Sequence, residues 1–554
     1  MEIVLDQCSM ATLSPVICPV KAQQIRFIKY PRKHLLLLGI FFSIFSCQRP
    51  VLELDYLIQG ALVFNGENQE PAYRDVGVLG DQIVLVGDAS RFTITTERTI
   101  DATGLYLSPG FIDPHTHLDR DLSDADSNKR ANLSALRQGV TTIISGNDGG
   151  SPIPIGRKLE ELDRNGVGTN VGFFVGHGSV RRLVLGLDAV QPTVEQLEEM
   201  KGIVAKSMEE GAFGISTGLF YAPASFAKED EVVALAEIVS GYGGIYDTHM
   251  RDESSYSIGL LASVEEVISI GRKAKLPVHI SHIKALGSDV WGKSKEVVAL
   301  VEQAQAEGIS VTANQYPYLA SKTSFRATVI PRWAEAGGEE AMRSRLRSSE
   351  IRERLILEIT ENIRKRGGAE SLVFSETANP TYEGMSLKTF AETRLLSEAE
   401  AVLAILEEEP GLGVISYNMV EEDLRYFMQQ PWVVTGSDAS SGHPRKFGSF
   451  ARKIGQYAVE EKWLSLPFAI HQSSGKTAEI LGMKDRGFIK EGFIADLCLF
   501  DPKEFREIST FESPYEEAVG MEYVFVNGQL VIDNGEIMGI LAGRALRHFK
   551  TDSK

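Results

Sequence analysis

The sequence predicts an α/β protein built around a (β/α)8 TIM-type barrel, with a small β-sandwich domain assembled from both ends of the chain. Three observations predict this fold. The centre of the chain alternates short apolar stretches with helical stretches, which is typical of parallel βα units. β-rich sequence lies on both sides of this centre, and a long charged insertion separates the last two apolar stretches.

A basic and then apolar segment precedes the first β-rich stretch. Four basic residues between positions 26 and 33 are followed by the apolar run 35–46, which has the length of a signal-peptide core and is shorter than a membrane span of ~20 residues. The run ends in Ile-Phe-Ser-Cys at Cys47, which resembles a bacterial lipobox, although Phe45 is bulky for this pattern. We therefore expect residues 1–47 to be an N-terminal extension with a lipoprotein signal, lipidated at Cys47. The protein would then be exported and lipid-anchored in the bacterial cell envelope, on the periplasmic side; an uncleaved anchor and a chance apolar run are the alternatives.

The composition excludes some classes of partner. The 554 residues are 43% hydrophobic and 24% charged, so the chain can bury a large core. The net charge of −18 argues against a nucleic-acid partner, because binding to phosphates needs a clustered basic face. The four cysteines indicate no disulfide framework. We expect contact with a membrane only through the lipid anchor.

The β-sandwich domain is predicted from residues 48–108 together with 486–554. Both parts contain short strands of alternating apolar and polar residues, separated by Gly and Asp turns. The clearest examples are residues 56–64, 82–87, 495–501 and 522–528.

The predicted barrel covers residues 109–485. Its eight strand candidates are residues 106–113, 140–145, 170–175, 212–216, 244–248, 278–281, 311–315 and 432–436. About a hundred residues separate the seventh and eighth candidates. We assign about 325–425 to an insertion, whose charged helical part at 333–365 is expected to lie over one face.

Histidines and aspartates follow five of these strands. In such barrels the chemistry lies at the carboxyl ends of the strands. The residues there are His115 and His117, Asp148, His249, His282 and Asp438. Each one alone has an ordinary explanation as a turn, a helix cap or a core histidine. Their recurrence at five strand ends predicts a site for zinc or a similar divalent ion, because imidazoles and carboxylates are its ligands.

The same residues belong to motifs whose order resembles the amidohydrolase superfamily. The motifs are GFIDPHTH (110–117), THMR (248–251), SHIK (281–284), YPY (316–318), GSD (436–438) and HPR (443–445). Within that superfamily the chain is most similar to the D-aminoacylase (N-acyl-D-amino-acid deacylase) group, from about Leu52 to Leu546. It departs from the group at Asp148, where the group usually has a cysteine.

The resemblance implies a metal-dependent amidohydrolase that acts on C–N bonds other than peptide bonds. Its cofactor would be Zn²⁺, as one or two ions, with another divalent metal as the alternative. Asp148, His249 and His282 would hold the tighter ion, and His115 and His117 would contribute to a second site.

The resemblance also implies roles in catalysis and substrate binding. Asp438 would be the catalytic acid–base residue. Lys284, Tyr316, His443 and Arg445 match substrate-binding positions, and the two cationic side chains would hold the carboxylate of the product amino acid. The expected reaction is deacylation of an N-acyl-D-amino acid, a small-molecule substrate, to a carboxylate and a D-amino acid.

Two other functions stay open at this point. One is another amidohydrolase reaction, on a cyclic amide or a dipeptide. Hydantoinase-like relatives commonly have a carboxylated lysine, and the fourth strand candidate, 212–216, contains no lysine, which favours the deacylase group. The other is a non-catalytic, lipid-anchored binding protein that has kept the fold and lost activity.

Overall fold

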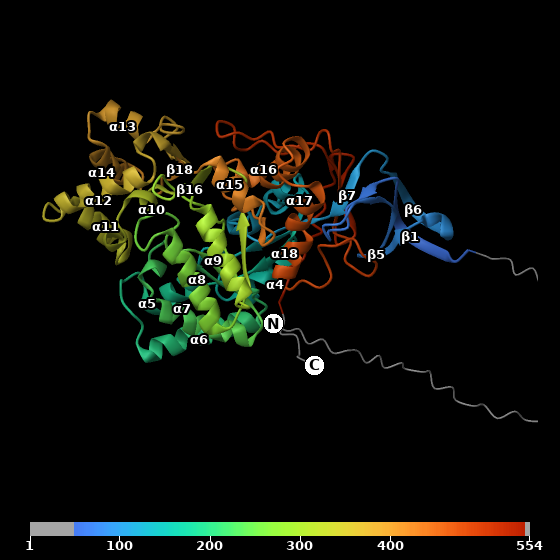
Figure 1. Ribbon diagram of the computed structural model, residues 1–554, viewed down its shortest axis with the longest axis horizontal. Coiled ribbons are helices and arrows are strands. Elements are labelled where there is room, and N and C mark those ends of the chain that lie inside the picture. The colour runs from blue at the N-terminus through green and yellow to red at the C-terminus, as the bar shows by residue number, and fades with distance from the viewer. Residues whose placement is uncertain (1–48, 549–554) are drawn as a thin grey trace, which may run out of the picture. The chain divides into compact units, whose positions relative to one another are not determined.

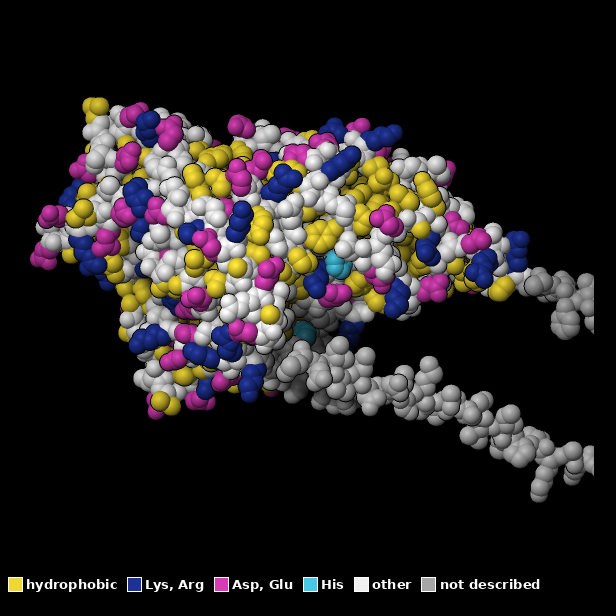
Figure 2. All heavy atoms as spheres, in the orientation of Figure 1, with side chains coloured by type: hydrophobic (Ala, Val, Ile, Leu, Met, Phe, Trp, Pro, Cys, Tyr) yellow, Lys and Arg dark blue, Asp and Glu magenta, His cyan; other side chains and the backbone are white. Residues whose placement is uncertain are grey.

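The computed structural model describes residues 49–548 (Figure 1). The predicted N-terminal extension and its candidate lipidation site, Cys47, lie outside the described residues. Within 49–548 no helix is both long enough and apolar enough to cross a membrane. On the face drawn in Figure 2, acidic and basic side chains are interspersed among apolar ones.

Parallel strands form the predicted barrel. They are β8 (Phe111–Asp113), β9 (Val140–Ser145), β10 (Asn170–Phe173) continued by β11 (Val175–Gly176), β12 (Gly214–Gly218), β13 (Ile245–His249), β14 (Val278–Ile280), β15 (Val311–Gln315) and β19 (Val433–Thr435). Neighbours pair in parallel in chain order. The loops after β8 and β19 close the ring, because Asp438 N–H donates to His115 O and His117 N–H donates to Ala439 O, both at 3.0 Å. The fold class predicted from the sequence is confirmed.

Helices alternate with these strands. They are α1 (Asp119–Leu122), α2 (Ser127–Arg130), α3 (Leu133–Leu136), α4 (Ile155–Asn165), α5 (His177–Leu185), α6 (Val194–Glu209), α7 (Glu229–Gly241), α8 (Leu260–Ala274), α9 (Ser294–Ala306), α15 (Glu421–Met428), α16 (Arg445–Ala451), α17 (Leu466–Ser473) and α18 (Gly475–Ile480). A π-helical stretch, η5 (Arg452–Glu460), follows α16. α8 illustrates their packing, since its buried residues Leu260, Val264, Val267 and Gly271 recur at helical spacing and share one face.

Two sheets form the β-sandwich domain. The first contains β5 (Gln82–Gly87), β4 (Asp75–Leu79), β1 (Val51–Gln59) and β6 (Thr93–Asp101). The second contains β23 (Glu536–Ile537), β22 (Gln529–Asp533), β21 (Met521–Val526), β20 (Leu497–Phe500), β7 (Tyr106–Pro109), β2 (Leu62–Val63) and β3 (Ala72–Tyr73). Both sheets contribute to one apolar core, in which Ile58, Val76, Leu107, Leu497 and Phe525 are buried. Strands from both ends of the chain therefore share this domain.

The first strand candidate, 106–113, is two strands. β7 pairs within the sandwich and β8 pairs within the barrel, and Gly110 separates them. A Cβ atom at Gly110 would lie 2.2 Å from Thr141 Oγ1, so no larger residue fits where the chain passes between the two domains.

The insertion between β15 and β19 has its own sheet and core. Its elements are β16 (Ala320–Ser324), α10 (Phe325–Val329), α11 (Gly338–Arg347), α12 (Arg352–Lys365), β17 (Leu372–Ser375), α13 (Leu387–Arg394), α14 (Glu398–Glu408) and β18 (Gly413–Tyr417). The helices group together in Figure 1. Phe325, Leu355, Phe374 and Phe390 are buried among them. The helical content was expected from the sequence, and the antiparallel sheet β16-β18-β17 was not.

Candidate metal centre and active site

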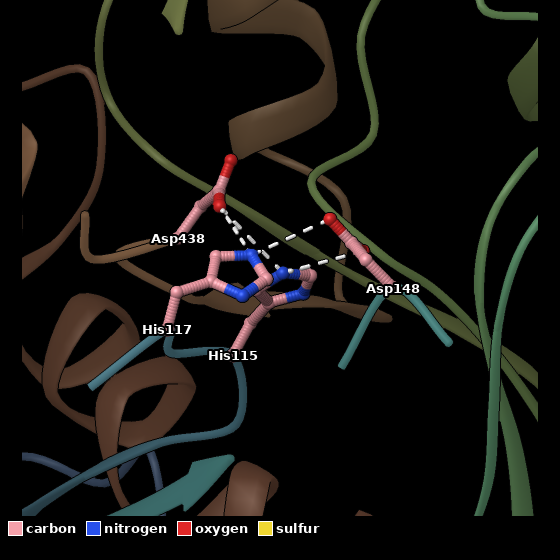
Figure 3. A group of neighbouring side chains, drawn as sticks. All are labelled: His115, His117, Asp148 and Asp438. Atoms are coloured by element: carbon pink, nitrogen blue, oxygen red, sulfur yellow. Dashed lines mark ion pairs between the residues drawn. The ribbon is translucent and has the colours of Figure 1, made fainter. Parts of the chain in front are cut away.

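The loops after β8, β9 and β19 bring the first group of predicted ligands together (Figure 3). His117 Nε2 lies 3.4 Å from Asp148 Oδ2 and 3.2 Å from Asp438 Oδ1. His115 Nε2 lies 3.5 Å from Asp148 Oδ1. One ligand atom from each of the four residues lies within 4.8 Å of the others, a spacing at which they could share a metal ion.

Asp148 also belongs to a second group, with His249 and His282. Its Oδ1 lies 3.5 Å from His282 Nε2, and its Oδ2 lies 3.6 Å from His249 Nδ1. These two imidazole nitrogens are only 3.0 Å apart. Because each oxygen of Asp148 faces histidines of both groups, the carboxylate is placed to bridge two ions.

The donor set fits a divalent metal. Imidazole nitrogens and a carboxylate are ligands for Zn²⁺. Two buried atoms that point into the cluster, His115 Nε2 and Asp148 Oδ1, have no hydrogen-bond partner among the described residues. Buried polar atoms are normally hydrogen-bonded, so these two unpaired atoms are consistent with ligands of a metal ion.

The backbone is strained at three of these positions. Asp148, His282 and Asp438 have φ angles of 54°, 35° and 49°, in the left-handed region that residues other than glycine rarely adopt. Such conformations persist only where surrounding contacts fix them, and they are concentrated at functional sites. Asn147 supplies such contacts: its side chain donates to Pro114 O at 3.0 Å and to Asp247 Oδ2 at 3.1 Å.

A buried carboxylate, Asp113, ties the loops of strands one and eight. It accepts hydrogen bonds from His115 N–H at 3.1 Å and from Ser437 N–H at 3.0 Å, and also from the Ser437 hydroxyl. Burial raises the pKa of Asp113 to about 7. These bonds hold His115 and Asp438 next to each other.

Asp438 is held as a carboxylate by Arg445. Arg445 Nη1 lies 2.7 Å from Asp438 Oδ2, whereas Oδ1 faces His117. Burial would raise the pKa of Asp438, but the charge of Arg445 and the hydrogen bond from His117 lower it below its usual range. One oxygen is thus fixed by the guanidinium and the other faces the ligand cluster.

Three of the predicted substrate-binding residues line the cavity at the cluster. Lys284, Tyr316 and Arg445 all contribute to its wall, and its volume is about 330 Å³. The hydroxyl of Tyr316 is buried without a hydrogen-bond partner among the described residues, and the Arg445 guanidinium lies 4.8 Å from its ring centre. A substrate oxygen could therefore pair with this hydroxyl.

The structure does not bring His443, the fourth of these residues, into the cavity wall. Its Nε2 lies 3.1 Å from Ala320 O, and its Nδ1 accepts from Arg445 N–H at 3.0 Å. Both ring nitrogens are therefore engaged with the backbone. That His443 binds substrate stays a prediction, and the contact of its Nδ1 with Arg445 N–H lies next to a residue that does line the cavity.

Sequence reasoning missed Glu253. This buried carboxylate lies 2.6 Å from Lys284 Nζ and 3.0 Å from His282 Nδ1. It orients the ring of a predicted ligand and neutralises the lysine beside it. Its position four residues after His249 was the only signal in the sequence, because nothing periodic marks that loop. Tyr221 and Arg366 also line the cavity and were also missed.

The chain is similar to known amidohydrolases along most of its length. A family model described as "Amidohydrolase family" matches residues 98–532. A D-aminoacylase of Alcaligenes xylosoxydans xylosoxydans is 31% identical over 519 residues, which are 89% of this chain and 97% of that protein. An N-acyl-D-aspartate deacylase of the same organism is 31% identical over 515 residues, 88% of this chain and 93% of the relative.

Solved structures show the same relationship. A D-aminoacylase crystal structure superposes with a TM-score of 0.76 at 31% identity, covering 89% of this chain and all of that one. An N-acyl-D-glutamate deacylase from Bordetella bronchiseptica, complexed with zinc and a phosphonate inhibitor, has a TM-score of 0.76 at 26% identity and covers 90% of this chain. A D-hydantoinase, at 15% identity and a TM-score of 0.55, shares the fold.

Proposed function

The chain belongs to the amidohydrolase family, and from this premise we propose that it is a metal-dependent N-acyl-D-amino-acid deacylase. It would hydrolyse a linear amide to a carboxylate and a D-amino acid. The observation that carries this proposal is the cluster of four histidines around Asp148, with Asp438 beside it, at the mouth of the barrel of a chain that is 31% identical to a D-aminoacylase over 519 residues.

Asp148, His249 and His282 would hold the tighter metal ion, and His115 and His117 would complete a second position. Zn²⁺ suits this donor set, as one ion or two. When bound, it lowers the pKa of its water to roughly 7 and polarises the amide carbonyl.

Asp438 moves the proton. Its Oδ1 faces the cluster and accepts the proton of the attacking water, and the carboxyl then delivers it to the leaving amine nitrogen. The contact with Arg445 at 2.7 Å keeps the side chain in one orientation and favours the ionised form that accepts the proton.

The α-carboxylate of the substrate lies among Tyr316, Arg445 and Lys284. The free hydroxyl of Tyr316 donates a hydrogen bond, and the two cations supply charge. Glu253 forms an ion pair with Lys284 and so holds the charged amine in a fixed position. Arg445 would serve both the substrate and Asp438.

The test is a hydrolysis screen of the purified, zinc-loaded full-length protein. N-acyl-D-amino acids, their L enantiomers, cyclic amides and dipeptides are compared by kcat/KM. We expect cleavage of the D series. Cleavage confined to L enantiomers, cyclic amides or dipeptides contradicts the assignment, and a metal-loaded protein that cleaves none of them supports a binding role instead.

We also propose that the protein is exported and lipid-anchored at Cys47. The basic region, the apolar run 35–46 and the lipobox-like ending support this location. Cells labelled with radioactive palmitate should give a labelled protein in the membrane fraction, and the Cys47→Ala variant should lose the label. Equal labelling of both proteins, or no labelling of either, contradicts the proposal.

A further inference from the structure

Arg366 is a buried cation in the wall of the metal cavity. It directly follows α12 of the insertion, only 3% of its surface is exposed, and it lines the same cavity as Asp148 and His249. The proposed reaction does not use it.

Unlike the other cations of this cavity, Arg366 has no carboxylate partner. Lys284 pairs with Glu253, Arg445 pairs with Asp438, and Lys322 pairs with Glu376. Within residues 49–548, Arg366 forms no ion pair, and its Nε is buried without a hydrogen-bond partner. Burial of an unpaired charge is costly, so this guanidinium is placed for an anion that the described chain does not supply.

Aromatic rings hold the guanidinium in place. It lies 5.2 Å from the ring centre of Tyr256 and 5.7 Å from that of Phe220. Phe220 in turn stacks on His249 at 5.6 Å, so one ring separates Arg366 from a predicted metal ligand. Cation–π contacts fix the position of a guanidinium without neutralising its charge.

Tyr256 offers a second donor at the same place. Its hydroxyl is also buried without a hydrogen-bond partner among the described residues, and Tyr256 lines the same cavity. Burial raises the pKa of Tyr256 to about 12, so the phenol keeps its proton at neutral pH. The phenol and the guanidinium can therefore both donate to one oxyanion.

Contacts with the barrel loops fix the end of α12. Arg364 Nη1 and Nη2 lie 2.9 and 2.8 Å from the two oxygens of Asp289, in the loop after β14. The Ser371 hydroxyl donates to Arg366 O at 2.7 Å. Arg366 is thereby held at a defined place relative to the barrel.

We propose that Arg366 and Tyr256 form a subsite for a second carboxylate of the substrate, in addition to the α-carboxylate. This proposal rests on the proposed function. A guanidinium grips a carboxylate through two parallel hydrogen bonds, which suits an acidic substrate better than a neutral one. The second carboxylate could belong to the side chain of the D-amino acid or to the acyl group, and the test separates these sources.

Two matched pairs of substrates form the test. N-acetyl-D-glutamate is compared with N-acetyl-D-glutamine, and N-succinyl-D-alanine with N-butanoyl-D-alanine. The wild type should prefer the dianionic member of one pair by about tenfold or more in kcat/KM, as expected for a hydrogen bond to a charged group. The pair that shows the preference identifies the source of the carboxylate.

The variant Arg366→Met should abolish that preference, and Arg332→Met is the matched control. Arg332 also lies over Phe220, at 4.1 Å, but it is paired with Glu335. The control should keep the wild-type ratio. Metal content and the unfolding temperature report whether each variant is folded. A wild type without preference in either pair, or an Arg366→Met variant with the wild-type ratio, overturns the proposal.

Calorimetry separates this proposal from the proposed function. If no N-acyl-D-amino acid is cleaved, the deacylase assignment fails, and binding of N-acetyl-D-glutamate, N-acetyl-D-glutamine and the two N-acyl-D-alanines to the zinc-loaded protein then decides the subsite. Tighter binding of a dianionic ligand that Arg366→Met loses supports the subsite. Equal binding of the members of both pairs, or a difference that survives in Arg366→Met, overturns it.

Discussion

Asp148, where the resemblance to the deacylase group predicts a cysteine, is the residue shared by both ligand groups. Its two oxygens lie 3.4 to 3.6 Å from the four histidines. A carboxylate can bridge two metal ions, but it is a harder ligand than a thiolate. Asp148 therefore offers two hard oxygen ligands where a cysteine would offer one soft sulfur.

Replacement of Asp148 tests its place in both groups. We expect Asp148→Ala to lose most bound zinc, because no other carboxylate within residues 49–548 faces all four histidines. Asp148→Cys should retain zinc, since a thiolate is a zinc ligand. Metal analysis of the purified variants measures both effects. Full zinc content in Asp148→Ala would show that Asp148 is not a ligand.

We expect that Asp438 can be replaced without loss of the proposed tighter ion. Asp438→Asn keeps the size of the side chain and removes its ability to accept a proton. We expect zinc content close to that of the wild type and a kcat lowered by about 10²–10⁴-fold, the usual contribution of general acid–base catalysis. Stopped assays together with metal analysis measure this, and near-wild-type turnover would rule out the assigned role.

Lys453, which lies outside the metal cluster, should make the free energy of unfolding depend on pH. It lies in η5, it is buried, and burial lowers its pKa to about 7 from an unfolded value near 10.5. Between these values the unfolded chain binds more protons, so stability rises with pH. Below pH 7 the penalty of charging the buried amine is fully present.

Lys453→Met removes this penalty and keeps the apolar stem. The variant should be more stable than the wild type by a few kcal/mol at pH 7, as a shift of several pKa units implies. The difference should vanish near pH 10.5. Apparent unfolding temperatures at several pH values measure it, and a constant difference across this range would contradict the assignment.

At the scale of elements, the site joins barrel loops to an insertion with its own core. β16 supplies Lys322 to the cavity and the end of α12 supplies Arg366. The predicted metal ligands all come from the barrel. The predicted metal site therefore depends on the barrel, whereas the part of the cavity wall formed by Lys322 and Arg366 depends on the insertion.

The Phe374→Ala variant tests whether metal binding depends on the core of the insertion. This buried side chain packs between Phe325 and Phe390, with ring centres 5.3 and 5.8 Å away. Its loss should cost about 3–5 kcal/mol within the insertion core. Limited proteolysis should cut the variant faster between β16 and β18, and zinc content should stay unchanged. Loss of zinc in a folded variant would show that the insertion also supports the metal centre.

The strand ends that carry the ligands could be predicted, because apolar stretches and the barrel rule place them together. β14 ends at Ile280, and His282 has a φ of 35°, so the alternation of side chains along a strand could not have placed His282 or Lys284. Lys284 nevertheless reaches the cavity. Glu253 and Arg366 could not be predicted, because a loop and an insertion bring them there through tertiary contacts.

At the scale of the molecule, the second part of the β-sandwich domain, at residues 486–548, is hydrogen-bonded to the barrel. Asn170, at the start of β10, donates to Asp496 at 3.0 Å and accepts from Asn527 at 2.7 Å. Arg486 completes this buried network, 2.6 Å from Asp496. Alternating strand patterns predicted a β domain built from both ends of the chain, but the partners of Asn170 lie more than 300 positions away, which no local pattern reveals.

Metal removal and return, on an N-acyl-D-amino acid substrate, tests the proposed function most directly. The full-length protein is stripped with a chelator, and Zn²⁺ is titrated back while hydrolysis is followed. We predict no turnover without metal and recovery at one or two zinc ions per chain, because Asp148 and the four histidines form the only candidate centre among residues 49–548. Undiminished hydrolysis by the stripped protein, or no hydrolysis after zinc is restored, would contradict it.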